Sequence, residues 1–191
     1  MSKTIVIYNS KTGYTKKYAE WIASELACEI NDQRDLNLTR YKEFDTIIFG
    51  GSLYATGISG LKKFIKGLDE VEGKNIIVFA TGLSLKSEEV RTEVMKANFK
   101  TPYEKQIEFF YYRGGFNFQN LPAVDKILMQ IMKKSIERKA KKGTELTSDE
   151  KGMLAVFDDE VDFTNQRSIR GLLDYVRSLD VHTEGMEKTS H

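Results

Sequence analysis

Short β-branched and aromatic segments alternate with stretches of helical periodicity along this chain, and this alternation restricts the fold more than any other feature. Four segments are almost continuously apolar, as strands covered on both faces are: residues 4–8 (TIVIY), 45–50 (DTIIFG), 75–80 (NIIVFA) and 107–112 (IEFFYY). A weaker strand is predicted between Cys28 and Leu38. Because strands that alternate with helices form right-handed βαβ units, the pattern predicts an α/β fold whose parallel sheet has helices on both faces.

The segments between these strands carry apolar residues at helical spacing. Residues 15–27 form one such stretch, and further helices are predicted over residues 59–68, 87–97 and 165–179. A chain of 191 residues with 40% hydrophobic content can form one core, which predicts a single domain over residues 1–181. Residues 182–191 lack an apolar pattern and are predicted to be a disordered tail.

The composition excludes several classes of protein. A formal net charge of only +1 provides no basic field, so no nucleic-acid partner is expected. The single cysteine, Cys28, cannot form an intrachain disulfide, which fits a reducing compartment and a cytoplasmic location. Both histidines, His182 and His191, lie in the predicted tail, so neither a metal cluster nor a catalytic histidine is expected. No apolar run approaches the ~20 residues of a membrane span, and the first residues are too briefly apolar for a signal peptide.

The loop after the first strand, Ser10-Lys11-Thr12-Gly13-Tyr14-Thr15, has the composition of a phosphate-binding turn. It carries hydroxyl groups at its first, third and sixth positions, and Gly13 allows successive backbone N–H groups to converge. A helix is predicted to begin at Thr15, so its free N–H groups and positive dipole end face the same loop. The loop matches neither the Walker A pattern nor the GxGxxG pattern. A plain helix N-cap explains the same residues, and the loop alone leaves both interpretations open.

Two further unusual loops also follow strands, and ligands of open doubly wound sheets bind where the carboxyl ends of strands meet. Residues 51–60 (GSLYATGISG) include Ser52, Leu53, Tyr54 and Ala55; their glycines and Gly50 permit close approach of a flat ligand. Residues 81–90 (TGLSLKSEEV) begin with Thr81, Gly82, Leu83 and Ser84, which can hydrogen-bond a polar ring edge. Each loop has an ordinary structural explanation by itself. Together with the first loop, they predict a site for a phosphorylated planar heterocycle, with flavin mononucleotide (FMN) as the natural candidate.

With these loops in place, the sequence resembles the flavodoxin family. The family's phosphate loop reads (S/T)-x-T-G-x-T, and Ser10-x-Thr12-Gly13-x-Thr15 matches it throughout. The order of loops is similar over residues 3–112 and again at the terminal helix. The resemblance implies a flavodoxin-like doubly wound sheet of five parallel strands in the order 2-1-3-4-5, with FMN as cofactor. It also implies that residues 10–15 surround the phosphate, that Leu53 and Tyr54 lie near the isoalloxazine, and that residues 81–84 line its opposite or polar side.

Within that family, the sequence is most similar to flavodoxin-like protoporphyrinogen oxidases, the quinone-linked dehydrogenases. The stretch FGGSLYATGISGLKKFIK is similar to that group's second loop and following helix, and RGGFNFQNLPAVDKILMQIMKK lies where the group carries an insertion. The likeness implies an enzyme of heme biosynthesis that passes hydrogens from a porphyrinogen through FMN to a quinone at the membrane. Two departures are visible. The second loop lacks an Arg-Tyr-Gly stretch, and the third lacks the aromatic residue that many flavodoxins stack on the flavin.

The insertion, at about residues 113–163 and before the last helix, is longer than an ordinary connection. A helix is predicted from Ala123 to about Lys142, with an apolar stripe at residues 124, 127, 128, 131 and 132. Packing of this stripe on the sheet is favoured. Residues 125–142 also hold seven basic and two acidic residues, an excess of +5, which suits an anionic membrane surface, an acidic partner or a propionate-bearing substrate. Phe116, Phe118 and Leu121 are candidates to cover the flavin or its substrate.

Two functions from different classes remain open. The favoured one is an FMN-dependent oxidoreductase with a small-molecule substrate, in which the cofactor does the redox work and no catalytic side chain is nominated. The alternative is a flavodoxin electron carrier that docks a redox partner protein and transforms no substrate. Carriers of this kind are typically strongly acidic, whereas this chain is near neutral. A flavin-free binding protein is a third interpretation.

Overall fold

Five parallel strands form the centre of the protein. The structure is a computed structural model, and it describes residues 3–35, 38–54, 56–68, 73–84, 88–101, 104, 107–146, 154, 157 and 160–187. The strands are β1 (Thr4–Asn9), β2 (Glu29–Asp32), β3 (Thr46–Tyr54), β5 (Asn75–Gly82) and β6 (Glu108–Arg113). They lie in the order β2-β1-β3-β5-β6, and each neighbouring pair is parallel. Numbered along the chain, this order is 2-1-3-4-5, which confirms the predicted doubly wound fold.

The end of β3 departs from the prediction. The sequence suggests a strand that ends at Gly50, but β3 continues to Tyr54 and pairs with β5 as far as Ser52 and Thr81. A short strand, β4 (Gly57–Ile58), then folds back antiparallel onto the end of β3, so the sheet has six strands rather than five. Half of the predicted second loop is therefore a β-hairpin.

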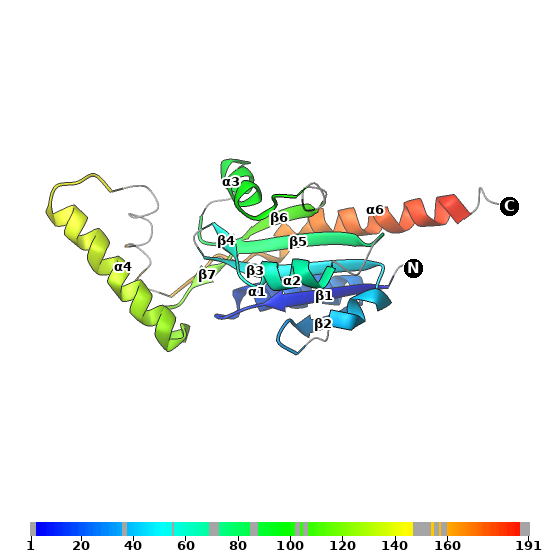
Figure 1. Cartoon of the computed structure of the whole chain (residues 1–191), viewed down its shortest axis with the longest axis horizontal. Coiled ribbons are helices and arrows are strands. Elements are labelled where there is room, and N and C mark those ends of the chain that lie inside the picture. The colour runs from blue at the N-terminus through cyan, green and yellow to red at the C-terminus, as the bar shows by residue number, and fades with distance from the viewer. Residues whose placement is uncertain are drawn as a thin grey trace.

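Helices cover both faces of the sheet (Figure 1). Helices α1 (Tyr14–Leu26) and α6 (Arg170–Glu187) share one buried cluster, to which α1 contributes Tyr18 and Ile22. Helices α2 (Leu61–Leu68) and α3 (Glu88–Asn98) lie over the other face with the 3-10 helix η1 (Leu38–Glu43). The strands supply alternate residues to the two clusters, because successive side chains of a strand point to opposite faces.

The terminal helix is longer than predicted. A 3-10 turn, η4 (Gln166–Ile169), precedes α6, and the Asn165 side chain caps it by accepting a hydrogen bond from the Arg167 backbone N–H at 3.0 Å. Helix α6 continues to Glu187, whereas the sequence suggests a disordered tail from His182. Residues 188–191 lie outside the described part of the chain.

The insertion leaves the sheet after β6 and returns beside its own starting point. Strand β7 (Gly115–Phe116) pairs antiparallel with β8 (Val161–Asp162). Between them come the 3-10 helix η3 (Phe118–Asn120) and α4 (Ala123–Lys141), which matches the predicted helix. Figure 1 shows α4 standing beyond the end of the sheet rather than on one of its faces. The favoured expectation that its apolar stripe packs on the sheet is therefore wrong.

Two tyrosines stack on each other in the core between α1 and β6, with ring centroids of Tyr18 and Tyr112 4.9 Å apart. The Tyr18 hydroxyl donates to the Arg113 carbonyl at 2.8 Å and accepts from the Asn165 backbone N–H at 3.0 Å. The buried Tyr112 hydroxyl has no hydrogen-bond partner among the described residues, and burial raises the pKa of Tyr112 well above its ordinary value. The same chemical group thus has opposite energetic roles at the two positions.

Replacing each tyrosine by phenylalanine separates these roles. Y18F is expected to lower the free energy of unfolding by about 1–3 kcal/mol, because it leaves two backbone groups without their partner. Y112F is expected to be neutral or to raise the free energy by up to about 1 kcal/mol, because it removes a desolvated hydroxyl and keeps the ring. Urea denaturation of both variants measures the difference. Equal losses in both would show that the Tyr112 hydroxyl is hydrogen-bonded after all.

Candidate functional site

The loop between β1 and α1 is held in a tight turn. Gly13 has a φ of +95°, in the left-handed region that glycine adopts without strain. Its backbone N–H donates to the Ser10 hydroxyl oxygen at 3.1 Å, and its carbonyl accepts from the Lys17 backbone N–H at 2.9 Å. A Cβ added at Gly13 would meet no atom within 4 Å, so space lies open beside the turn.

The first turn of α1 has no side-chain cap among the described residues. Its N-cap position is Gly13, and no side chain accepts a hydrogen bond at this cap. The Ser10 hydroxyl accepts only from the N–H of Gly13 itself, so among the described residues no serine or threonine hydroxyl caps the N–H groups within α1. The first N–H groups of a helix have no intrahelical partner and, with the positive dipole end, bind anions. The turn thus presents these groups next to the hydroxyls of Ser10 and Thr12.

A hydroxyl pair joins this turn to the third loop. Thr15 Oγ1 and Thr81 Oγ1 are 2.7 Å apart, and both residues are buried. Thr15 belongs to α1, whereas Thr81 lies near the end of β5, two strands away from β1 in the sheet. One hydroxyl donates to the other, so the hydrogen of the accepting hydroxyl is not used in this bond. The bond fixes the first and third loops relative to each other.

Two lysines in and just after the turn form ion pairs with the insertion. Lys11 Nζ lies 2.7 Å from Asp125 Oδ2 of α4, and Lys17 Nζ lies 2.8 Å from Asp162 Oδ2 of β8. The Tyr14 ring packs against Gly115 of β7, where an added Cβ would overlap it. Burial, together with the charges of Glu160 and Asp162, raises the pKa of Tyr14. Tyr14 therefore points to the base of the insertion, and the predicted phosphate contacts are left to its backbone.

The second group of predicted residues lies at the end of β3. Ser52 and Leu53 are half-buried, whereas Tyr54 is 54% exposed. The Leu53 side chain lies close to Gly82, so the ends of β3 and β5 form one continuous surface. Ala55 lies outside the described residues. The side chain of Tyr54 is thus open to solvent, and the placing of Leu53 and Tyr54 beside a flavin stays a prediction.

The glycines at the end of β3 do not serve the ligand as expected. A Cβ at Gly50 would overlap the ring of Phe79, and one at Gly51 would lie 2.5 Å from the Ser59 carbonyl oxygen. Both positions are buried by the protein itself. These glycines therefore make room for a neighbouring strand and hairpin rather than for a flat cofactor, which corrects that interpretation.

The third group, Thr81 to Ser84, is anchored by the neighbouring strand. The Gly82 carbonyl accepts from the Gly114 backbone N–H at 2.7 Å, and the Ser84 carbonyl accepts from the Tyr111 hydroxyl at 2.9 Å. Arg113 Nη2 lies 3.5 Å from the Leu83 carbonyl, at the limit of a hydrogen bond. Residues 85–87 lie outside the described part. Sequence patterns do not reveal these anchors, because they come from a strand about 30 positions further along the chain.

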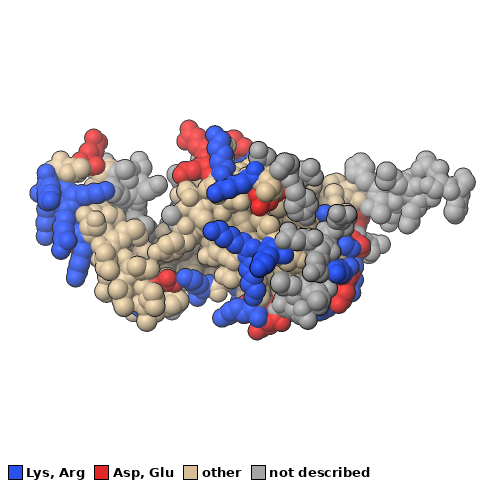
Figure 2. Space-filling model, in the orientation of Figure 1, with Lys and Arg blue, Asp and Glu red and all other residues tan. Residues whose placement is uncertain are grey.

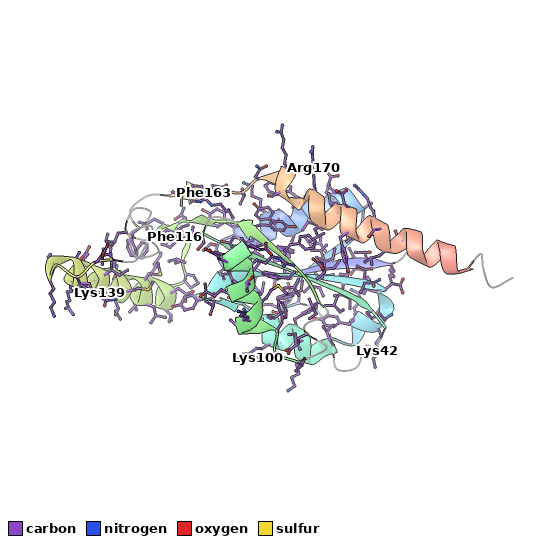
Figure 3. All side chains as sticks on the ribbon, turned by 90° about the horizontal axis from the view of Figure 1, so that it is seen from above. Lys42, Lys100, Phe116, Lys139, Phe163 and Arg170 are labelled. Atoms are coloured by element: carbon purple, nitrogen blue, oxygen red, sulfur yellow. The ribbon has the colours of Figure 1, made fainter. Side chains whose placement is uncertain are left out.

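The aromatic residues of the insertion are occupied by their own small core. Phe116 packs with Met129 and Phe157, and Phe118, Leu121 and Leu83 pack against that cluster. Figure 3 shows Phe116 and Phe163 at the junction between the sheet and α4. The suggestion that Phe116, Phe118 and Leu121 form a free cover is not supported by this packing. Through Leu83, however, the cluster touches the third loop.

The sheet edge thus combines groups for a planar, phosphorylated ligand. Free helix N–H groups and hydroxyls lie at the end of β1, and apolar and polar surfaces lie at the ends of β3 and β5. In the described part of the chain, no group of three or more His, Cys, Asp or Glu residues is placed to hold a metal ion. Nor does any described helix have the length and apolar character needed to cross a membrane.

Cys28 lies just before β2, at the opposite edge of the sheet from this site. Burial raises the pKa of the Cys28 thiol to about 11, with a smaller contribution from Glu29 and an opposing one from a backbone hydrogen bond. Because the thiolate is the reactive form, we expect iodoacetamide to alkylate Cys28 at pH 8.5 about a hundredfold more slowly in the native than in the urea-unfolded protein. The native rate should rise as the pH approaches 11. Rapid native alkylation at pH 8.5 would contradict this packing role.

Comparison with known proteins is informative at the family level. A family model described as a flavodoxin domain matches residues 5–143. The flavodoxin, WrbA-like protein of Agrobacterium tumefaciens shares 18% identity at a TM-score of 0.46, covering 66% of this chain and 88% of that one. Flavodoxin 2 of Bacillus cereus shares 18% identity at a TM-score of 0.45, covering 58% and 84%. A Lactobacillus acidophilus flavoprotein, solved in complex with FMN, shares 15% identity at a TM-score of 0.43, covering 59% and 93%. No curated protein matches the chain with significant similarity.

Proposed function

The chain belongs to the flavodoxin family, and we propose on this premise that it is an FMN-dependent oxidoreductase. Membership of this family indicates that the cofactor is FMN. The observation that carries the proposal is the uncapped first turn of α1 beside the Ser10–Gly13 turn. A phosphate group fits this position, because it accepts several hydrogen bonds and neutralises the positive end of the helix dipole.

The residues predicted for the site divide into a phosphate set and a ring set. Ser10, Lys11, Thr12, Gly13, Tyr14 and Thr15 would hold the phosphate, Tyr14 through its backbone. Ser52, Leu53, Tyr54 and Ala55 would line one side of the flavin ring, and Thr81, Gly82, Leu83 and Ser84 the other. When bound, FMN supplies reversible one- and two-electron chemistry. The chain itself binds and orients the ring, excludes water from it, and sets its hydrogen bonds.

The finer part of the proposal concerns the reaction. We propose a protoporphyrinogen-oxidase-like activity, in which a porphyrinogen is the hydrogen donor and a quinone or another molecule is the acceptor. The insertion supports this activity, since it lies at the sheet edge where the cofactor would bind and contacts both Lys11 and Leu83. We place the reaction in the cytoplasm, at the inner face of the membrane when the acceptor is a quinone.

The second candidate is an electron carrier that docks a redox protein. The exposed Tyr54 at the end of β3 favours this possibility, since an open flavin edge passes electrons to a docked partner without binding a substrate. The balance of charge is against it. A net charge of +1, with a local excess of +5 over residues 125–142, does not resemble the strongly acidic surface typical of carriers.

Anaerobic reduction of the FMN-loaded protein distinguishes these functions. We expect protoporphyrinogen to bleach the flavin absorbance, and a quinone to restore it. Bleaching by a reductase partner but not by protoporphyrinogen would identify the carrier. A protein whose absorbance spectrum does not change when FMN is added would overturn both and leave a flavin-free binding protein.

A further inference from the structure

Helix α4 exposes an apolar face that nothing in the described part of the chain covers. Its first two turns present Val124, Ile127, Leu128 and Ile131, which are 69, 58, 45 and 60% exposed. The spacing of three and four residues places them on one side of the helix. Among the described large apolar side chains that are exposed, only Tyr54 lies elsewhere. Burial of such a face is the usual reason for its existence, so a partner is required.

The same side of the helix becomes basic toward its C-terminus. Continuing from Ile131 in steps of three and four residues leads to Ser135, Arg138 and Lys142, all of which are exposed. Lys134 is exposed beside them. Figure 2 shows the result: Lys and Arg gather at the far end of α4, whereas Lys126 is the one basic residue in the first half of the helix. Figure 3 labels Lys139 near that far end.

The opposite side of α4 is occupied by the protein. Met129 and Ile136 are buried, and Met129 belongs to the small core with Phe116 and Phe157. Lys133 Nζ lies 4.4 Å from the centre of the Phe157 ring, so this lysine faces inward. The helix is therefore anchored along one side, and its apolar and basic halves face outward along the other.

We propose that this outward face, Val124, Ile127, Leu128, Ile131, Arg138 and Lys142, docks onto the surface of an anionic lipid bilayer. The apolar side chains would enter the boundary between headgroups and acyl chains, while the basic ones contact lipid phosphates. Charge selects lipid over a second copy of the chain. Residues 125–142 carry +5 and the whole chain +1, so the remaining residues carry −4. Two copies meeting through α4 would bring like charges together.

Vesicle co-sedimentation of the full-length protein tests this inference without any flavin signal. We expect binding to vesicles that contain phosphatidylglycerol, little binding to pure phosphatidylcholine, and release by high salt. The variant K134Q/R138Q/K142Q should bind about a hundredfold more weakly, since each basic residue contributes about fivefold. The variant I127Q/I131Q should bind at least about tenfold more weakly, because it removes the inserted apolar surface.

The matched control is K62Q/K63Q/K66Q, which removes three exposed lysines from α2 and changes the net charge equally. Its binding should stay within about twofold of the wild type. Equal losses in the two triple variants would mean that only net charge matters, and absence of binding to anionic vesicles would reject the lipid surface. If analytical ultracentrifugation shows a dimer that I127Q/I131Q abolishes, the face binds a second copy instead. Any of these results leaves the proposed flavin reaction intact, since flavin reduction is measured separately.

Discussion

Replacing Gly50 by alanine is expected to lower the free energy of unfolding by about 3 kcal/mol. Gly50 of β3 lies directly opposite Phe79 of β5, in the centre of the sheet. An added Cβ would overlap the Phe79 ring and lie 2.6 Å from its Cε1 atom. Phe79 is fully buried among other core residues, so it cannot move aside without strain. Overpacking of this kind costs about 1–3 kcal/mol or more in a well-packed core.

Urea denaturation of G50A measures this loss, and Gly57 provides the control. Gly57 is exposed in β4, and an added Cβ there would lie 3.6 Å from the Tyr54 carbonyl oxygen, an ordinary contact. G57A should therefore change the stability by less than about 0.5 kcal/mol. If G50A unfolds at the same urea concentration as G57A, the Phe79 ring does not occupy the space above Gly50.

The second large effect concerns FMN affinity. Replacing Thr12 and Thr15 together by valine is expected to weaken FMN binding by about a hundredfold. Valine keeps the shape of threonine but removes the hydroxyls that would donate to the phosphate in the proposed site, and a hydrogen bond to a charged group contributes about 1.5–3 kcal/mol. Quenching of FMN fluorescence during titration measures the dissociation constant. Unchanged affinity would return this loop to the role of a simple helix terminus.

The Thr15 hydroxyl also bonds Thr81, so the double variant needs a check on folding. T81V removes the same hydrogen bond from the other side. It should therefore lower the free energy of unfolding by about as much as the double variant does. The single variant T12V should weaken FMN binding by about tenfold without that loss. Thr4, at the opposite end of β1, is a suitable control position, since T4V should leave FMN affinity unchanged.

The strands of this fold were predictable because they are buried on both faces. In β5, for example, a run of β-branched and aromatic residues, Ile76 to Phe79, is buried, and such a run is typical of a strand covered on both faces. Strand β4 was missed because two residues in a glycine-rich hairpin carry no periodicity. The extension of β3 was missed for a related reason: the GGSLY stretch has the composition of a loop, and only pairing with β5 makes it a strand.

The site was predictable at the level of loops but not of contacts. The spacing of hydroxyls around a glycine indicates a phosphate turn, since both features are local. The partners of those residues are distant in sequence: Lys11 and Asp125 are 114 positions apart, and Thr15 and Thr81 are 66 apart. The pattern of α4 likewise shows that the helix has an apolar face, but a pattern does not contain the neighbour that covers it.

The pairing of β7 with β8 has a consequence for how this protein can be rebuilt. Gly115 lies opposite Asp162, and the Phe163 backbone N–H donates to the Gly114 carbonyl at 2.9 Å. The insertion therefore begins and ends at the β7–β8 pair, and neither of these strands belongs to the main sheet. A short turn that joins Phe116 to Val161 would convert β7 and β8 into a plain β-hairpin. The insertion can thus be exchanged as a unit at the loss of its contacts with Lys11 and Leu83, and under the proposed docking such an exchange would alter the surface to which the protein binds.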